Sequence, residues 1–267
     1  MARLTSIFSN SRIPFLSSAK DDPKTGRVDA PVEVVRQEED LSFSKRLRSE
    51  TSQAHRIVES TNFVKGVLRG VMDLESFANM QAGMYLVYNA METELERHKD
   101  HPLVSSVHFP ELSRRAVLEE DLRFLYGEDW ESKIQSTPAR EAYVERIHWL
   151  GDNDPGLLVA HSYTRYLGDL SGGQVVKKIA RRSLDLDSRD GLRFFDFDEV
   201  EDCNALKREY RARLDSLPLS DIRALEVIEE AKHVFALNQH LFEEMEGSWI
   251  RTLANFIPID FNSRLRA

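Results

Sequence analysis

Residues 157–180 read LLVAHSYTRYLGDLSGGQVVKKIA, and this stretch decides the fold. Its apolar residues recur at spacings of three and four, which is the pattern of a helix. Asp154 and Pro155 precede it as a predicted N-cap and first turn, and a run of basic residues closes it. Gly168, Gly172 and Gly173 lie in its middle, where each costs roughly 1 kcal/mol relative to alanine. Something in the folded protein must offset that cost.

The three glycines allow two interpretations. Small residues on one helix face permit close packing against another helix, and Gly168 and Gly172 are four residues apart. A backbone without Cβ atoms can also bend and lie close to a flat surface. The polar neighbours Arg165, Asp169 and Ser171 favour this second interpretation, because a simple packing seam does not require them.

Helical spacing continues outward in both directions from about residue 41. Thr137 followed by Pro138 predicts another helix start, and Ser220 is placed to cap a long last helix. The alternating run 192–200 is the single strand-like stretch and is short. The sequence therefore predicts an all-α bundle of about seven or eight helices, given usual helix lengths of ~10–20 residues.

Composition excludes several classes of protein. The chain has 267 residues, of which 41% are hydrophobic and 30% are charged, and it has a net charge of -9. Such an acidic balance argues against nucleic acid as the main partner. Cys203 is the one cysteine, so an internal disulfide or a cysteine metal cluster is impossible. We expect no membrane span, because no apolar run approaches the ~18 residues that one needs.

The two ends of the chain differ from the middle. Residues 1–20 include three basic residues, no acidic residue and many serines, and Pro14, Pro23 and Pro31 interrupt any long helix, as in an organelle transit peptide or a disordered polar leader. The run 249–261 is apolar in places but interrupted by polar residues and a proline, and we interpret it as a docking tail. We therefore expect a leader over 1–40, one functional domain over 41–250 and a C-terminal tail over 251–267.

The motif in the middle of the glycine-containing helix is long enough to be compared with known families. Residues 160–174, AHSYTRYLGDLSGGQ, resemble the signature of the heme oxygenase family. The resemblance extends over most of 41–250 and includes the segments 55–59, 109–111, 118–122, 207–211, 229–232 and their continuation to Phe242. The soluble cyanobacterial and plastid members are the most similar. The resemblance implies a single-domain multihelical bundle that holds heme between a proximal helix and a kinked distal helix.

On the proximal side, the resemblance selects one of eight histidines. It places His55 at the position of the axial heme ligand, a role that neutral imidazole fills well. Glu59, one helical turn later, is the expected acceptor for the other ring nitrogen, directly or through water. Without the resemblance, Glu59 would be an ordinary solvated residue. His161 belongs to the signature but is expected to be a core or network histidine.

On the distal side, the resemblance assigns the glycines and their neighbours. Gly168, Gly172 and Gly173 would let the helix backbone lie over the porphyrin and direct oxygen toward one meso carbon. Asp169 would hold a water network that delivers a proton to oxygen. Other family positions along that network are occupied by Arg165, Asn238, Tyr88, Tyr143 and Tyr166. The same residues could equally be buried polar groups that satisfy one another.

Cations are expected where the two heme propionates leave the pocket. The matching positions are Arg48, Lys207 and Arg211, with a hydroxyl contact from Tyr163. Arg48 is a departure, because many members have lysine there, and arginine changes the contact geometry. Phe235 matches an apolar wall position and could also be simple core packing. Lys207 and Arg211, four residues apart, could also form an ordinary solvated face.

The implied reaction converts heme, as cofactor and substrate, to biliverdin (the IXα isomer by family expectation), carbon monoxide and ferrous iron. It consumes molecular oxygen and electrons, for which reduced ferredoxin is the expected donor. A candidate docking surface for that acidic protein consists of Arg48, Lys177, Lys178, Lys207 and Arg211. A bilin reductase could act downstream. The expected location is the plastid stroma if the leader is a transit peptide, and otherwise the cytoplasm.

Two further interpretations stay open. Glu145-x-x-His148 and Glu230-x-x-His233 have the ligand spacing of a di-iron oxygenase built on a helical bundle. A member of the same family that binds heme without cleaving it, as a buffer or sensor, is the other. The presence of His55, Asp169 and all three glycines argues against this non-catalytic form.

Overall fold

The computed structural model describes residues 41–186 and 188–256, with side chains described as far as residue 245. This part of the chain contains eight α-helices, five short 3₁₀ helices and no strand, which confirms the predicted all-α class. The leader over 1–40 and the end of the tail, 257–267, lie outside the described residues. Helix α8, Asp221–Phe256, continues through 251–256, where a separate tail was expected.

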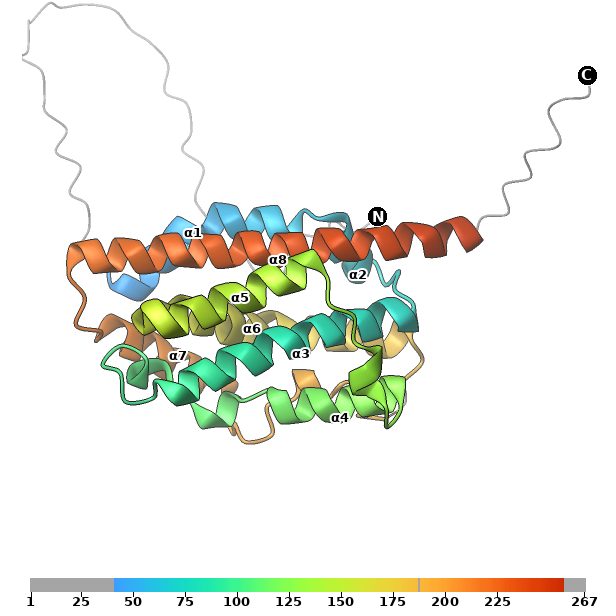
Figure 1. The fold of residues 1–267 in the computed structure, drawn as a ribbon, viewed down its shortest axis with the longest axis horizontal. Helices are drawn as coiled ribbons and strands as arrows, with labels where there is room; N and C mark the ends of the chain where they lie inside the picture. The colour runs from blue at the N-terminus through green and yellow to red at the C-terminus, as the bar shows by residue number, and fades with distance from the viewer. Residues whose placement is uncertain (1–40, 187, 257–267) are drawn as a thin grey trace, which may run out of the picture.

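The helices form layers around one core (Figure 1). Helices α1, Phe43–Glu59, and α8 lie side by side along one edge, and α2, Asn62–Leu68, packs beside them. Helices α3, Leu74–Arg97, and α5, Pro138–Asn153, pack against each other, with α4, Arg115–Tyr126, on the outer side of α3. Helix α6, Leu158–Ser183, runs through the middle, and α7, Cys203–Asp215, completes one end.

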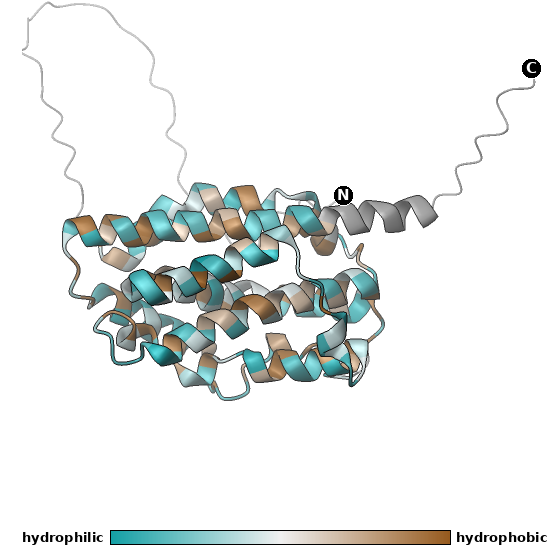
Figure 2. Cartoon of the chain, viewed as in Figure 1, coloured by the Kyte–Doolittle hydropathy of each residue, from teal (hydrophilic) through white to brown (hydrophobic). Residues whose placement is uncertain are grey.

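Apolar and polar residues alternate around the helices rather than along whole segments (Figure 2). Large side chains that are fully buried, such as Phe77, Tyr88, Tyr143 and Leu158, fill the space between α3, α5 and α6. No helix among the described residues has a stretch long and apolar enough to cross a bilayer. Outer helices such as α1 and α4 bury one face, whereas the first half of α6 is buried on nearly all sides.

Helix starts agree only in part with the sequence signals. Ser220 caps α8 as predicted, because its hydroxyl accepts from the backbone N–H of Arg223 at 3.2 Å. Thr137 and Pro138 stand at the start of α5, although the Thr137 hydroxyl donates to Glu244 instead of capping the helix. The prediction that Asp154 caps the glycine-containing helix is wrong. Its carboxylate pairs with Arg223, and a 3₁₀ turn, η4, Pro155–Leu157, precedes α6.

The run 192–200 is not a strand. Residues Arg193–Phe195 form a 3₁₀ turn, η5, within a loop that packs against α4 and α6. The apolar residues Leu192, Phe194 and Phe197 are buried in this loop. The alternating pattern therefore reflects side chains that are buried at intervals along a loop and not pairing with another strand. The remaining 3₁₀ helices are η1, Ser105–Val107, η2, Pro110–Leu112, and η3, Trp130–Lys133.

Candidate functional site

A cavity of about 620 Å³ lies between α1 and α6, with further walls from α2, α3, α8 and η5. This volume falls within the roughly 300–1,000 Å³ that is usual for sites that hold small molecules and cofactors. Of the residues that the resemblance assigns to the site, Lys207, Tyr88, Tyr143 and Tyr166 do not line the cavity. The twelve that do are Arg48, His55, Glu59, Tyr163, Arg165, Gly168, Asp169, Gly172, Gly173, Arg211, Phe235 and Asn238. The bundle therefore gathers residues that are as much as 190 positions apart.

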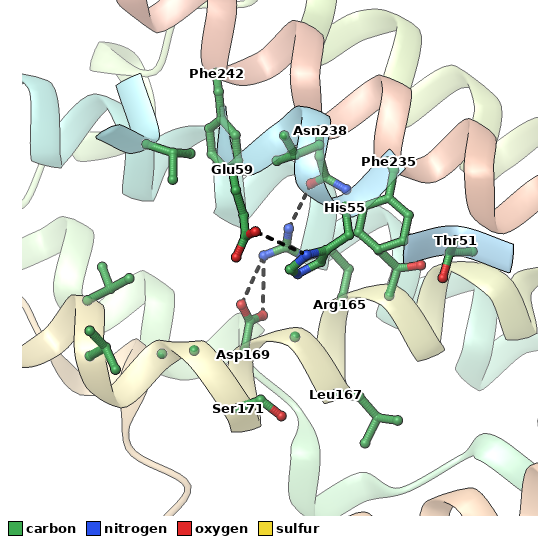
Figure 3. Close-up of a pocket in the computed structure, with 18 of the residues that line it drawn as sticks. Thr51, His55, Glu59, Arg165, Leu167, Asp169, Ser171, Phe235, Asn238 and Phe242 are labelled. Carbon is green, nitrogen blue, oxygen red and sulfur yellow. Dashed lines mark hydrogen bonds and ion pairs between the residues drawn. The ribbon is translucent and has the colours of Figure 1, made fainter. Parts of the chain in front are cut away.

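Helix α1 supplies a histidine to one wall of the cavity (Figure 3). The His55 side chain is about one-third exposed, with 37% of its surface accessible, and its Nδ1 lies 3.6 Å from Glu59 Oε2. Phe235 on α8 packs edge-on to the imidazole, with ring centroids 5.6 Å apart. Burial lowers the pKa of His55, and this effect prevails over the opposing charge of Glu59. The imidazole is therefore neutral at neutral pH, as a metal-ligating histidine must be.

The opposite wall is the glycine-containing part of α6. A Cβ atom added to Gly168 would have no neighbour within 4 Å, because this position faces open space. At Gly173 an added Cβ would lie 3.4 Å from the ring of Phe195. Close helix packing therefore does not explain Gly168, and the interpretation of a backbone that borders a flat ligand accounts for it.

Asp169 follows Gly168 on α6 and is held by two partners, of which Figure 3 shows Arg165. The Tyr88 hydroxyl donates to its Oδ2, and one Arg165 nitrogen lies 3.2 Å from both carboxylate oxygens. Burial, followed by the charge of Asp169, raises the pKa of Tyr88 well above its ordinary value. Tyr88 therefore stays protonated and keeps donating, so the carboxylate is fixed at the edge of the cavity.

The network continues away from the cavity through Arg165. Its second terminal nitrogen donates to Asn238 Oδ1 at 2.7 Å, and the Asn238 amide lies 3.4 Å from the Tyr143 hydroxyl. Burial raises the pKa of Tyr143 to about 12. Among the residues that the structure describes, buried Arg165 Nε has no hydrogen-bond partner, so this part of the core contains a polar atom that the protein side chains leave unsatisfied. Tyr166 is turned elsewhere, because its hydroxyl donates to Glu92 at 3.1 Å.

The cations at the rim differ from the expected set. Arg48 is exposed and lines the cavity, and Arg211 lines it from α7 while donating to the Lys207 carbonyl at 3.2 Å. Tyr163 lines it between them. Lys207 does not line the cavity, so only its backbone contributes, through Arg211. The spacing of four residues put both cations on one helix face but could not show which of them reached the rim.

Sequence reasoning missed much of the apolar wall. Its members come from α2, α3, α8 and η5, and they include Phe63, Met80, Met84, Phe194, Phe195 and Phe242. These residues have the spacing of ordinary core positions, so nothing in the sequence distinguished them from residues that only pack the core. The pair Phe194-Phe195 was the one local indication, because two adjacent aromatic side chains in a loop must both be buried against other residues.

The structure gives the di-iron interpretation no support. The Glu230 carboxylate is already bound by His161 at 2.9 Å and by Arg146. His148 contacts Glu94 at 2.7 Å and not Glu230. Within residues 41–186 and 188–245, no group of three or more His, Cys, Asp and Glu side chains could hold a metal ion. His161 itself is fully buried, as expected of a core histidine.

Together, the fold and the cavity define a helical bundle with a largely apolar pocket between a histidine-bearing helix and a glycine-containing helix, with arginines in its lining. Residues 41–244 match the sequence profile of a family described as heme oxygenase. The chain belongs to the heme oxygenase family.

Individual relatives agree with this assignment. A heme oxygenase from the red alga Porphyra purpurea is 45% identical over 216 residues, which cover 81% of this chain and 92% of the alga's. The crystal structure of heme oxygenase-1 from the cyanobacterium Synechocystis in complex with heme is similar, with a TM-score of 0.79 and 40% identity. It matches 81% of this chain and 97% of its own. Heme oxygenase from Leptospira interrogans has a TM-score of 0.74 and 42% identity, over 76% of this chain and all of that one.

Proposed function

We propose that this heme oxygenase binds heme in the cavity between α1 and α6 and opens the ring to biliverdin, carbon monoxide and ferrous iron. The observation that carries the proposal is the placement of His55 on one wall and of Gly168 with Asp169 on the opposite wall. The apolar lining suits a porphyrin face. Heme itself supplies the iron on which molecular oxygen reacts.

The residues of the chain have separate tasks in this proposal. His55 provides the axial nitrogen, which we assign to Nε2 because Nδ1 faces Glu59. Arg48 and Arg211 pair with the propionates at the rim, and Tyr163 adds a hydroxyl. These contacts determine how the ring is rotated in the cavity and therefore which of its four edges faces α6. The IXα isomer is the product that we expect.

Gly168 and Asp169 act on the oxygen side. The missing side chain at Gly168 leaves space over the ring and lets the helix backbone limit the directions open to oxygen. Asp169, held by Tyr88 and Arg165, is fixed where it can orient water and pass a proton to oxygen. Because its two partners stay protonated, the carboxylate keeps one orientation throughout.

A single-turnover absorbance experiment tests the function. Purified protein with one equivalent of hemin is mixed with ferredoxin, its reductase and NADPH, and ascorbate serves as the control reductant. We expect the Soret band to decay as biliverdin absorbance grows. A stable Soret band after confirmed reduction of the iron would favour the heme-binding, non-catalytic alternative.

We propose ferredoxin as the electron donor, on the grounds of surface charge. Arg48 and Lys178 are exposed cations on a chain whose net charge is -9. Lys177 is a weaker candidate than expected, because it forms an ion pair with Asp196. Reversal of charge in Lys178→Glu should slow ferredoxin-supported turnover and leave ascorbate-supported turnover unchanged. Lys99→Glu, at the end of α3, is the control.

A second proposal concerns the domain boundaries and the N-terminal residues, and it does not depend on the proposed reaction. We infer that residues 41–250 are the catalytic domain and that residues 1–40 are a leader that directs the protein to a plastid, where a bilin reductase could take up the product. The composition of residues 1–20, which include three basic residues, no acidic residue and several serines, supports this proposal. Fusion of residues 1–40 to a fluorescent protein in an algal cell tests it, with import into the plastid expected and cytoplasmic fluorescence contradicting it.

A further inference from the structure

Two aromatic rings from the loop after α6 close one side of the cavity. Phe194 and Phe195 both line it and are almost completely buried. The Phe194 ring meets Tyr88, the partner of Asp169, edge-on, with centroids 5.5 Å apart. The Phe195 ring lies against Gly173 on α6. This pair of rings therefore borders both the tyrosine that holds Asp169 and the glycine wall.

The backbone that carries these rings is held by a buried carboxylate. Asp121 on α4 accepts hydrogen bonds from the backbone N–H groups of Arg193, at 2.9 Å, and Phe194, at 2.8 Å. The Gln81 amide lies 3.3 Å from the same carboxylate and from the Gly191 carbonyl. The short turn η5 thus receives its fixed position from side chains of α3 and α4.

The carbonyl groups of the same turn are held from the other side. Buried Arg114 donates to the Phe194 carbonyl at 3.4 Å and to the Asp196 carbonyl. Gln174 on α6 donates to the Phe195 carbonyl at 2.7 Å. The side chains of Arg114, Asp121 and Gln174 therefore hold the backbone of four consecutive residues, 193–196.

A buried carboxylate at this position carries a large desolvation cost. Asp121 is fully buried, and burial raises its pKa to about 6 although two backbone N–H groups favour the charged form. Glu120 opposes the charge and Arg193 supports it. An apolar side chain would fill the same space at a lower desolvation cost but could not accept two N–H bonds. The gain from Asp121 is thus a defined position of the turn.

We propose that Asp121 is a positioning residue of the active site, which acts through η5 to hold Phe194 against Tyr88. The two rings then form a fixed wall that sets how far a porphyrin moves toward α4 and which edge it presents to Asp169. This inference rests on the proposed function for its link to the product, but its effect on ligand binding can be measured without turnover.

Asp121→Asn is the primary variant, because it keeps the size but leaves one backbone N–H facing an amide NH₂ group. Phe194→Leu removes the ring directly and leaves Asp121 in place. Glu120→Gln is the matched control, since Glu120 is exposed on the same helix and pairs with the side chain of Arg193, at 3.3 Å, instead of with the backbone of η5. Thermal melting of each variant establishes that it is folded.

The experiment measures the affinity for zinc protoporphyrin, which binds but is not turned over, and then the isomers of the bilin made from heme. We expect Asp121→Asn and Phe194→Leu each to weaken binding about tenfold, the equivalent of one lost buried hydrogen bond, and to yield mixed isomers. The double variant should be no worse than either single variant, because both act through one ring. Glu120→Gln should match the wild type.

Two outcomes would overturn the inference. One is a lower melting temperature for Asp121→Asn with wild-type affinity and a single isomer, which would make Asp121 merely structural. The other is full additivity of the two losses, which would show that Asp121 does not act through Phe194. Normal zinc protoporphyrin binding in a wild-type protein that makes no bilin would instead contradict the proposed function, and the affinity comparison would still decide the role of Asp121.

Discussion

His55 combines two properties that an axial ligand needs, a lowered pKa and a carboxylate beside its Nδ1. His55→Ala removes the nitrogen but leaves the apolar walls, so heme should still enter the cavity. Turnover should fall by at least about 100-fold, since even the partners of metal ligands are worth 10–100-fold. Added imidazole should restore part of the activity. Normal turnover without imidazole would remove His55 from this role.

Asp169 is fixed by neutral Tyr88 and by cationic Arg165, so its charge and not its size should matter. Asp169→Asn keeps the size and removes the charge. We expect near-normal heme affinity and a rate of bilin formation lower by roughly 10²–10⁴-fold, the usual contribution of acid–base groups. The hemin titration and the single-turnover rate are the two measurements. An unchanged rate would contradict the proton-transfer role.

For single residues, the sequence predicted which residues belong to the site better than it predicted which of them reach the cavity. The family resemblance, and not the motif 160–174 alone, assigned His55, Gly168 and Asp169 to one site, and all three line the same cavity. Lys207 was not separable from Arg211, since both lie on one helix face. Asp121 lies in the family-like segment 118–122, but nothing in the sequence indicated its role, because its partners are backbone groups 72 and 73 residues later in the chain.

The glycines of helix α6 favour ligand binding but lower the stability of the helix itself. Gly168→Ala should stabilise the heme-free protein by about 0.5–1 kcal/mol, because the new Cβ meets nothing and alanine favours a helix. The same methyl group occupies space next to the ligand, so heme affinity should fall. Urea unfolding and hemin titration measure the two effects.

Lys178→Ala is the control for this helix, because it lies on α6 outside the cavity and should leave heme affinity unchanged. A Gly168→Ala protein that binds heme as tightly as the wild type would contradict the close approach of α6 to the ring.

The elements themselves were predictable to different degrees. Regular helices such as α5 and α8 follow from apolar spacing and from Pro138 or Ser220 at their starts. The beginning of α6 and the run 192–200 were misjudged because tertiary contacts decide them. Asp154 is used by Arg223, and the loop is held by buried side chains of other helices.

The whole bundle depends on buried charges that join α5, α6 and α8. Burial alone would raise the pKa of Glu230, but hydrogen bonds from His161 and Arg146 outweigh it and lower the pKa to about 2. Because this value lies below the ordinary 4.5, the contribution of Glu230 to stability is complete above pH 4.5 and is lost as the pH falls toward 2.

Glu230→Gln should therefore reduce the free energy of unfolding at pH 7 by roughly 3–5 kcal/mol, the cost of breaking a buried ion pair. It should also flatten the decline in stability between pH 4.5 and pH 2. Urea unfolding at several pH values measures both. Glu229→Gln, an exposed neighbour that pairs with Lys232, is the control. The same acid slope in wild type and Glu230→Gln would contradict this assignment.

A crystal structure of the hemin complex would show the proposed heme site itself. We expect the iron bonded to Nε2 of His55, the ring in van der Waals contact with the backbone at Gly168, and the propionates beside Arg48 and Arg211. Iron bound by any other side chain, or a porphyrin lying away from α6, would contradict it.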